Sequence, residues 1–128
     1  MRHPAVAGMF YPGSDKDLTK ELKSCFRKGP GRIDRGEGRK VIGLVSPHAG
    51  YTYSGPTAAY GFLAMADGGI PDTVIVIGPN HHGLGETIGV SFDDFATPMG
   101  VMSNDRELAE AIGIPPDELS HVSEHSME

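Results

Sequence analysis

The fold is decided by the stretch Val41-Ile42-Gly43-Leu44-Val45-Ser46, a short continuous run of apolar residues. A second run of this kind, rich in β-branched residues, spans residues 73–78. Continuous apolar runs of this length are typical of strands that are buried on both faces of a parallel sheet. The two runs therefore predict two buried strands.

The chain between these two runs predicts a helix. Ser54 can cap a helix that continues to Ala66, and Gly68 and Gly69 follow as a stop signal. A strand, a helix and a second strand form one right-handed βαβ unit, in which the two strands lie parallel. The sequence therefore predicts an α/β fold.

Further elements are predicted on either side of this unit. Ser14 can cap a helix through Asp17 to Phe26, which has acidic residues in its first turn and basic residues at its end. Additional strands are expected at residues 88–92 and 99–102. A short helix is expected at residues 105–112, capped by Ser103 or Asn104.

Size and charge limit what the chain can be. Its 128 residues suffice for one domain, so residues 1–128 are predicted to form a single α/β domain. The formal net charge of -6 argues against electrostatic attraction to nucleic acid or anionic lipid. No apolar run approaches the ~20 residues of a membrane span. No nucleic acid and no membrane are therefore expected as partners.

The single cysteine, Cys25, excludes an intrachain disulfide and favours the cytoplasm as the compartment. It recurs with Leu18, Leu22 and Phe26 at helical spacing, so we interpret it as a packed core thiol rather than a reactive one. The basic stretch at residues 27–40 contains glycines but no aromatic residue, and we interpret it as an exposed linker.

A histidine follows each of the two predicted strands. His48 comes two residues after the first strand, and His81 comes three residues after the second. The carboxyl ends of parallel strands share one sheet edge, which is where open α/β sheets bind their ligands. Neutral imidazoles suit Zn, Fe, Cu or Ni, so His48 and His81 are the candidate metal ligands. The alternative is that each is a loop histidine hydrogen-bonded to backbone.

Other side chains near these histidines are candidates for supporting roles. His82 cannot point the same way as His81 on extended backbone, so it is either a donor beside the metal or a solvent-facing loop residue. Tyr51 and Tyr53 flank the His48 loop and could donate phenolic hydrogen bonds to a substrate. The alternative for both tyrosines is simple packing.

A rival metal site is suggested by His121-Val122-Ser123-Glu124-His125, which matches the H-x-x-E-H pattern of one class of zinc metalloproteases. On a helix, His121 and His125 would share one face, with Glu124 beside them as a base. This pattern predicts a zinc-dependent hydrolase. Otherwise, His125 is expected to be a pocket neighbour of the main site.

A phosphate site is a second rival. The glycine-rich residues 78–85 could cradle a phosphate through their backbone amides. They match neither the G-x-G-x-x-G nor the Walker pattern, which makes this the weaker alternative.

Four motifs together resemble the MEMO family, whose prokaryotic members are called AmmeMemoRadiSam system protein B. They occur in the order and at the spacing seen in that family, and they extend over the whole chain. They are Pro4-Ala5-Val6-Ala7-Gly8 with Phe10-Tyr11-Pro12, Pro47-His48-Ala49-Gly50-Tyr51 with Tyr53-Ser54-Gly55, Gly78-Pro79-Asn80-His81-His82, and Glu124-His125-Ser126-Met127-Glu128. The chain is thus similar to the N-terminal half of a MEMO protein.

The resemblance implies a fold similar to that of class III extradiol dioxygenases, with three layers, αβα, and a mostly parallel central sheet. It implies that His48 and His81 are metal ligands and that a third ligand, a cysteine of the C-terminal half, is absent from this chain. Cys25 does not occupy that position. The implied metal is iron or copper rather than zinc.

The function implied by the resemblance is a metal-dependent redox or oxygenase activity on an unknown substrate. The expected partners are an unknown small molecule or protein, and a C-terminal half that completes the domain. The alternative is a non-enzymatic module that binds a protein or phosphopeptide in the same pocket. It is motivated by the lack of an obvious general base and by a signalling relative in the family.

Overall fold

The computed structural model describes residues 1–128, which divide into two compact units. We call Ala7–Val74 the helical unit, and Met1–Val6 together with Ile75–Glu128 the histidine unit. None of the helices combines the length and the apolar composition needed to cross a membrane. The single domain expected over residues 1–128 stays a prediction.

The first helix of the helical unit, α1 (Asp15–Lys28), forms where the sequence predicts it. The Ser14 hydroxyl oxygen accepts a hydrogen bond from the Asp17 amide at 3.3 Å, which caps the helix. Cys25 is one of its buried residues, as expected for a packed thiol. Burial raises the pKa of this thiol, which keeps it protonated and poorly nucleophilic.

The second helix, α2 (Tyr51–Gly68), begins three residues before the predicted cap. The amides of Tyr53 and Ser54 donate to the Gly50 carbonyl, which adds a turn at the start. Ser54 does not cap the helix because its hydroxyl donates instead to the Ala49 carbonyl at 2.8 Å. The helix ends at Gly68, within the predicted stop signal.

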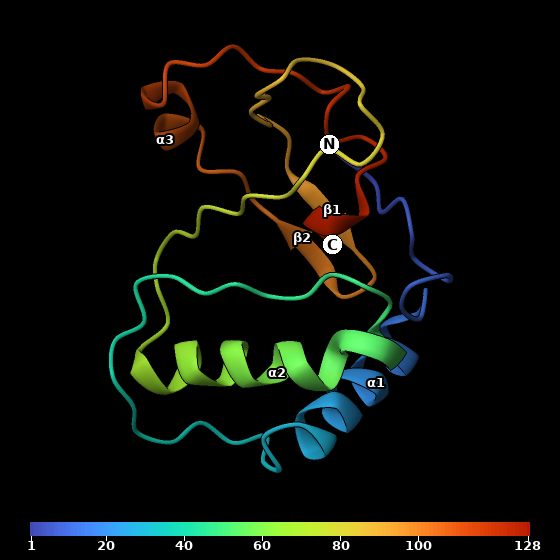
Figure 1. The fold of residues 1–128 in the computed structure, drawn as a ribbon, viewed down its shortest axis with the longest axis vertical. Helices are drawn as coiled ribbons and strands as arrows, with labels where there is room; N and C mark the ends of the chain where they lie inside the picture. Colours follow the sequence, from blue (N-terminus) through green and yellow to red (C-terminus); the bar gives the residue numbers. More distant parts are fainter. The chain divides into compact units, whose positions relative to one another are not determined.

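Glycines bring α1 and α2 into close contact in the helical unit (Figure 1). A Cβ atom at Gly55 would collide with the Cys25 sulfur, and one at Gly29 would collide with the Pro56 carbonyl. The absence of these side chains lets the two helices approach. The core of this unit lies at their contact, and its buried apolar residues are Tyr11, Leu18, Cys25, Ala59 and Leu63.

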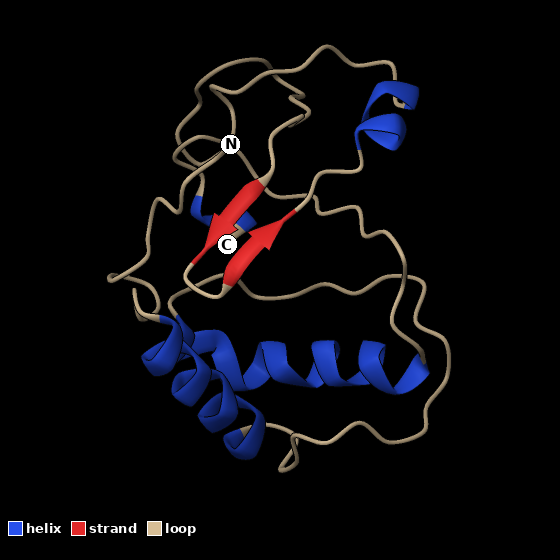
Figure 2. Ribbon diagram, turned by 180° about the vertical axis from the view of Figure 1, so that it is seen from behind, coloured by secondary structure: helices blue, strands red, loops and turns tan.

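Neither predicted parallel strand forms. Residues 41–46 and 73–78 are in no strand and are drawn as loop in Figure 2. Ile42 and Val45 are 99% and 101% exposed, and Ile77 is 90% exposed. The mostly parallel central sheet, and the three layers around it, are therefore not seen. An apolar run supplies the tendency to pair, but the pairing itself needs a partner strand from elsewhere in the chain.

The histidine unit contains a small antiparallel hairpin of β1 (Phe95–Thr97) and β2 (Gly100–Met102), with Phe95 opposite Met102. The structure is thus a mixed α/β fold with a two-stranded sheet. The prediction of a strand at residues 99–102 is confirmed. At residues 88–92 only an isolated bridge forms, between Val90 and Pro116.

Two short helices complete the histidine unit. Helix α3 (Arg106–Ala111) confirms the predicted helix, although the Asp105 carboxylate is its cap, because it accepts from the Leu108 amide at 3.1 Å. The chain ends in a turn of 3₁₀ helix, η1 (His125–Met127).

A buried arginine links the start of the chain to its last residues within the histidine unit. Arg2 is 3% exposed and pairs with the Glu128 carboxylate at 2.8 Å. Its guanidinium also donates to the carbonyls of His121 and Glu124, both at 2.8 Å. It lies over the Phe95 ring, 5.0 Å from the centroid. The segment that contains His121 and Glu124 is thereby fixed.

Candidate metal centre

His81 and His125 form a stacked pair in the histidine unit. Their ring centroids lie 4.3 Å apart, with 28° between the planes, and their candidate ligand nitrogens lie within 4.8 Å of each other. A shared ion would lie about 2.0–2.1 Å from each nitrogen, so the two nitrogens would have to lie within about 4 Å of each other when the ion is bound. The structure thus joins a predicted ligand, His81, to a residue expected only as a pocket neighbour, His125.

Gly78 has no side chain, which allows the backbone before His81 to pack closely against η1. A side chain at Gly78 would collide with the Ser126 hydroxyl and with the Met127 sulfur, which lies 2.7 Å from the position of its Cβ atom. The Ser126 hydroxyl also donates to the Pro79 carbonyl at 3.4 Å. Because η1 packs directly on the backbone before His81, His125 lies beside His81.

Glu124 is the buried charge of this centre. Its carboxylate accepts from the ring Nδ1 of His81 at 2.7 Å, from the His81 backbone amide at 2.7 Å and from the Ser126 amide at 3.1 Å. Burial acts to raise the pKa of Glu124, but these hydrogen bonds outweigh it and lower the pKa to about 2. Glu124 is therefore an ionised carboxylate, able only to accept hydrogen bonds.

His82 is turned away from this pair. Its Nε2 donates to the Ser123 carbonyl at 3.1 Å, and its side chain is exposed. The loop is closed by Asn80, whose side-chain oxygen accepts from the Gly83 amide at 2.9 Å and whose amide group donates to the Leu84 carbonyl at 2.7 Å. Since the amides of His81 and Gly83 already have partners, the loop is poorly suited to cradle a phosphate.

His48 belongs to the helical unit, where it lies three residues before the first residue of α2. Its loop is held by the Tyr51 amide, which donates to the Phe10 carbonyl at 2.8 Å. The Tyr51 ring packs on Tyr11 with centroids 5.2 Å apart, which supports the packing alternative for this tyrosine. Tyr53 is 86% exposed. That His48 and His81 bind one ion stays a prediction.

A family profile described as "Memo-like protein" matches residues 2–128 of the chain. The chain belongs to the Memo-like family. A MEMO1 family protein of Thermotoga petrophila is 45% identical over 99% of this chain and 50% of its own length. Similar proteins of Methanopyrus kandleri and Methanosarcina barkeri are 42% and 44% identical, with 48% and 46% of their lengths covered. The chain spans about half the length of the curated relatives it matches.

The zinc hydrolase geometry is absent from this Memo-like chain. The segment from His121 to Glu124 forms turns rather than an α-helix, and η1 begins only at His125. The His121 ring packs against Phe95, with centroids 5.8 Å apart, whereas the His125 ring stacks on His81. The two histidines therefore do not share a helix face, and the prediction based on the H-x-x-E-H pattern is wrong.

The buried ring of His121 should make the stability of the chain depend on pH. It is 6% exposed and neither ring nitrogen has a hydrogen-bond partner, so burial, and next the nearby Arg2, lower its pKa from the ordinary 6.5. The unfolded chain takes up this proton more readily, so the stability that neutral His121 allows is complete above pH about 6.5 and is lost as the pH falls. We expect the free energy of unfolding to fall less in His121→Phe than in the wild type when the pH is lowered from about 7 to 5. Urea unfolding at each pH measures this. Stability curves that stay parallel would contradict this.

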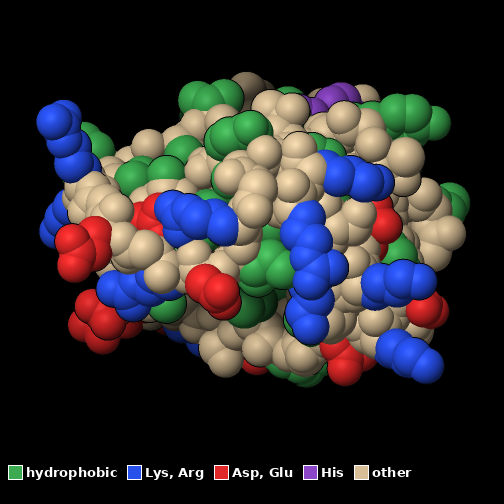
Figure 3. Space-filling view, turned by 90° about the horizontal axis from the view of Figure 1, so that it is seen from below, with side chains coloured by type: hydrophobic (Ala, Val, Ile, Leu, Met, Phe, Trp, Pro, Cys, Tyr) green, Lys and Arg blue, Asp and Glu red, His purple; other side chains and the backbone are tan.

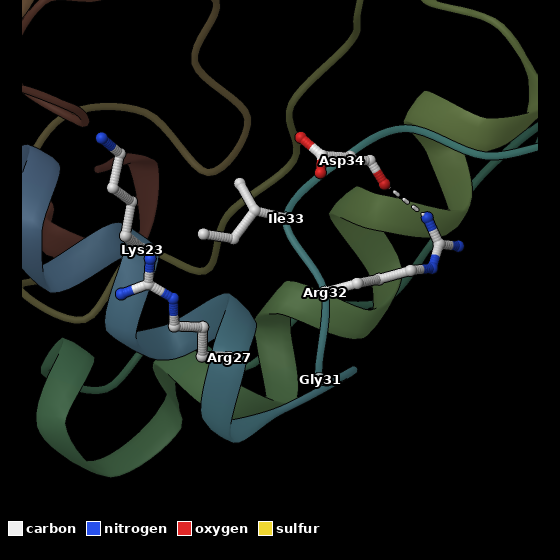
Figure 4. A pocket seen from close by; sticks show the side chains of 6 residues that line it. All are labelled: Lys23, Arg27, Gly31, Arg32, Ile33 and Asp34. Carbon is white, nitrogen blue, oxygen red and sulfur yellow. Dashed lines mark hydrogen bonds between the residues drawn. The ribbon is translucent and has the colours of Figure 1, made fainter.

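A pocket in the helical unit, lined by Lys23, Arg27 and residues 31–34, offers no comparable set of ligands (Figure 4). Arg32 is ion-paired with Asp67 and donates to the Asp34 carbonyl at 2.7 Å, so its charge is compensated. Figure 3 shows acidic side chains interspersed among the basic ones on one face of the molecule. These contacts agree with the interpretation of the basic stretch as an exposed linker.

Proposed function

We propose that His81 and His125 hold one metal ion, joined by His48 as the sequence predicts, and that this Memo-like chain is a metal-binding protein. The observation that carries the proposal is the stacked pair of His81 and His125, whose candidate ligand nitrogens lie within 4.8 Å of each other. A third imidazole from His48 would give a three-ligand set and leave a position open for water or substrate. His125, rather than a residue from outside the chain, would then be the third ligand.

The family resemblance favours iron or copper as this metal, because it implies redox or oxygenase chemistry on an unknown substrate. Imidazole ligands suit either metal and also zinc. A bound iron or copper ion would supply one-electron chemistry. We further propose a cytoplasmic location and a C-terminal half that completes the domain. The chain's own histidines would hold the ion, and Glu124, which lies next to His81 and His125, would place a negative charge close to it.

Metal content measures this proposal directly. The full chain is incubated with iron(II), copper(II) or zinc(II), desalted and analysed by mass spectrometry for metal per chain. We expect about one ion in the wild type and a large loss in His81→Ala and in His125→Ala, since either change removes half of the stacked pair. His48→Ala tests separately whether the helical unit supplies a ligand.

The control is His3→Ala, since His3 is an exposed histidine of the same unit that lies outside the candidate set. It should bind as much metal as the wild type. Undiminished metal in His81→Ala would end the proposal. Full binding in His48→Ala alone would remove His48 from the ligand set.

A further inference from the structure

We propose that Glu124 is a positioning residue, whose carboxylate holds the Nδ1–H of His81 and thereby presents Nε2 of that ring to the metal. This inference rests on the proposed function, which makes His81 a ligand. It assigns which ring nitrogen binds the ion and which residue enforces that choice.

The first support is a clamp on a single residue. One carboxylate oxygen of Glu124 lies 2.7 Å from Nδ1 of His81, and the other lies 2.7 Å from the backbone nitrogen of the same histidine. The two contacts fix both the backbone and the ring. The His81 side chain is 39% exposed, whereas that of Glu124 is 3% exposed. The buried carboxylate of Glu124 therefore orients the more exposed ring of His81.

The second support is the chemistry of hydrogen bonding. A carboxylate can only accept, so the ring nitrogen that faces it must carry the hydrogen. In a neutral imidazole the other nitrogen, Nε2, then keeps the lone pair that a metal needs. Metal-binding histidines usually donate their second N–H to a carboxylate or carbonyl, and loss of that partner typically costs 10–100-fold in metal affinity.

The third support is that the contact is selective among the neighbouring histidines. Nδ1 of His125 lies 3.8 Å from the same carboxylate, beyond hydrogen-bond distance. His82, next in sequence to His81, donates through Nε2 to the Ser123 carbonyl instead. Of these ring contacts, the one between Glu124 and His81 is therefore the one short enough for Glu124 to set a tautomer.

Glutamine at position 124 tests this assignment because it keeps the shape but changes the hydrogen bonding. A glutamine amide has one acceptor oxygen and one donor group, and it would face three N–H groups, two of His81 and one of Ser126. If the oxygen stays with Nδ1 and the Ser126 amide, the NH₂ group opposes the His81 backbone N–H and the two-point contact with His81 is lost. If the oxygen keeps the His81 backbone amide, the NH₂ group faces Nδ1, which must then accept. The ring proton moves to Nε2 and blocks the ligand nitrogen.

The experiment is long-range ¹⁵N NMR of the histidine rings in the metal-free full chain at about pH 8, where imidazoles are neutral. It is combined with zinc(II) affinity from a competition titration. We expect His81 to carry its hydrogen on Nδ1 in the wild type and to shift toward Nε2–H in Glu124→Gln, with zinc affinity about 10–100-fold lower. Glu118→Gln, at an exposed glutamate of the same unit, should match the wild type in both readouts.

The position of the ring hydrogen on His81 and the zinc affinity together decide the inference. A wild-type His81 with its hydrogen on Nε2 would overturn the inference, even if Glu124→Gln failed to fold. A folded Glu124→Gln chain with unchanged tautomer and affinity would overturn it as well. If the tautomer shifts as expected but the wild type binds no metal, the positioning contact is supported and the proposed function fails.

Discussion

Replacing Arg2 by alanine should lower the free energy of unfolding by about 3–5 kcal/mol. The Arg2 side chain is 1% exposed, and its guanidinium forms an ion pair with the Glu128 side chain, which is 6% exposed. Its removal leaves a nearly buried carboxylate without its cation and takes the donor from the carbonyls of His121 and Glu124. Leaving one partner of a buried pair costs far more than losing a surface pair. Urea unfolding followed by circular dichroism measures the change.

The matched control is Arg106→Ala, because Arg106 is an exposed arginine of the same unit. Its effect should stay within about 0.5 kcal/mol. Arg2→Lys keeps the charge but loses the planar fork that serves three acceptors, so its cost should lie between those of the two alanine variants. Equal costs for Arg2→Ala and Arg106→Ala would show that the buried network contributes nothing.

The Arg2 network also bears on the candidate metal centre. Arg2 holds the Glu124 carbonyl, and the Glu124 side chain holds His81. Glu128 in turn accepts from the amides of Ala5 and Val6, at 2.7 and 3.2 Å. The first six residues therefore fix the segment that orients a candidate ligand. The stability of this network and the geometry of the metal centre are physically linked.

The helices could be predicted because their signals are local. The Ser14 cap, the charges at each end of α1 and the glycines after α2 all act within a few residues. Sheet pairing is not local. The apolar runs at residues 41–46 and 73–78 predicted buried strands, yet Val45 and Ile77 are exposed and no partner strand pairs with them. In contrast, β1 had no sequence signal that we recognised.

The candidate site, like the fold, could be predicted only where its signals are local in the sequence. His81 stood out because it follows an apolar run in a motif with Pro79 and Asn80. The role of Glu124 did not, because it depends on a contact between residues 43 positions apart. The H-x-x-E-H pattern directed attention to Glu124 as a base, but the fold uses it as an acceptor for His81. The two family motifs that contain His81 and Glu124 are both recognisable in the sequence. The sequence alone could not show that they lie side by side.

The contact between α1 and α2 gives the second large expected effect. Gly55→Ala should destabilise the helical unit by about 1–3 kcal/mol, because the new methyl group collides with the sulfur of Cys25, a residue that is 4% exposed. Helix propensity alone predicts the opposite sign, since alanine is favoured over glycine inside a helix by about 1 kcal/mol. Urea unfolding of the variant decides between the two effects.

Gly61→Ala separates packing from propensity, because Gly61 lies in the same helix and its Cβ would meet the Leu44 side chain at an ordinary 3.5 Å. This variant should be more stable than the wild type by up to about 1 kcal/mol. Cys25→Ala then completes a double-mutant cycle with Gly55→Ala. Without the sulfur, the nearest atom to the new methyl group is the Cβ of residue 25 at 3.4 Å, so the cost of Gly55→Ala should largely disappear. A cost that persists in the Cys25→Ala background would place the strain in the helix backbone rather than at the contact of the two helices.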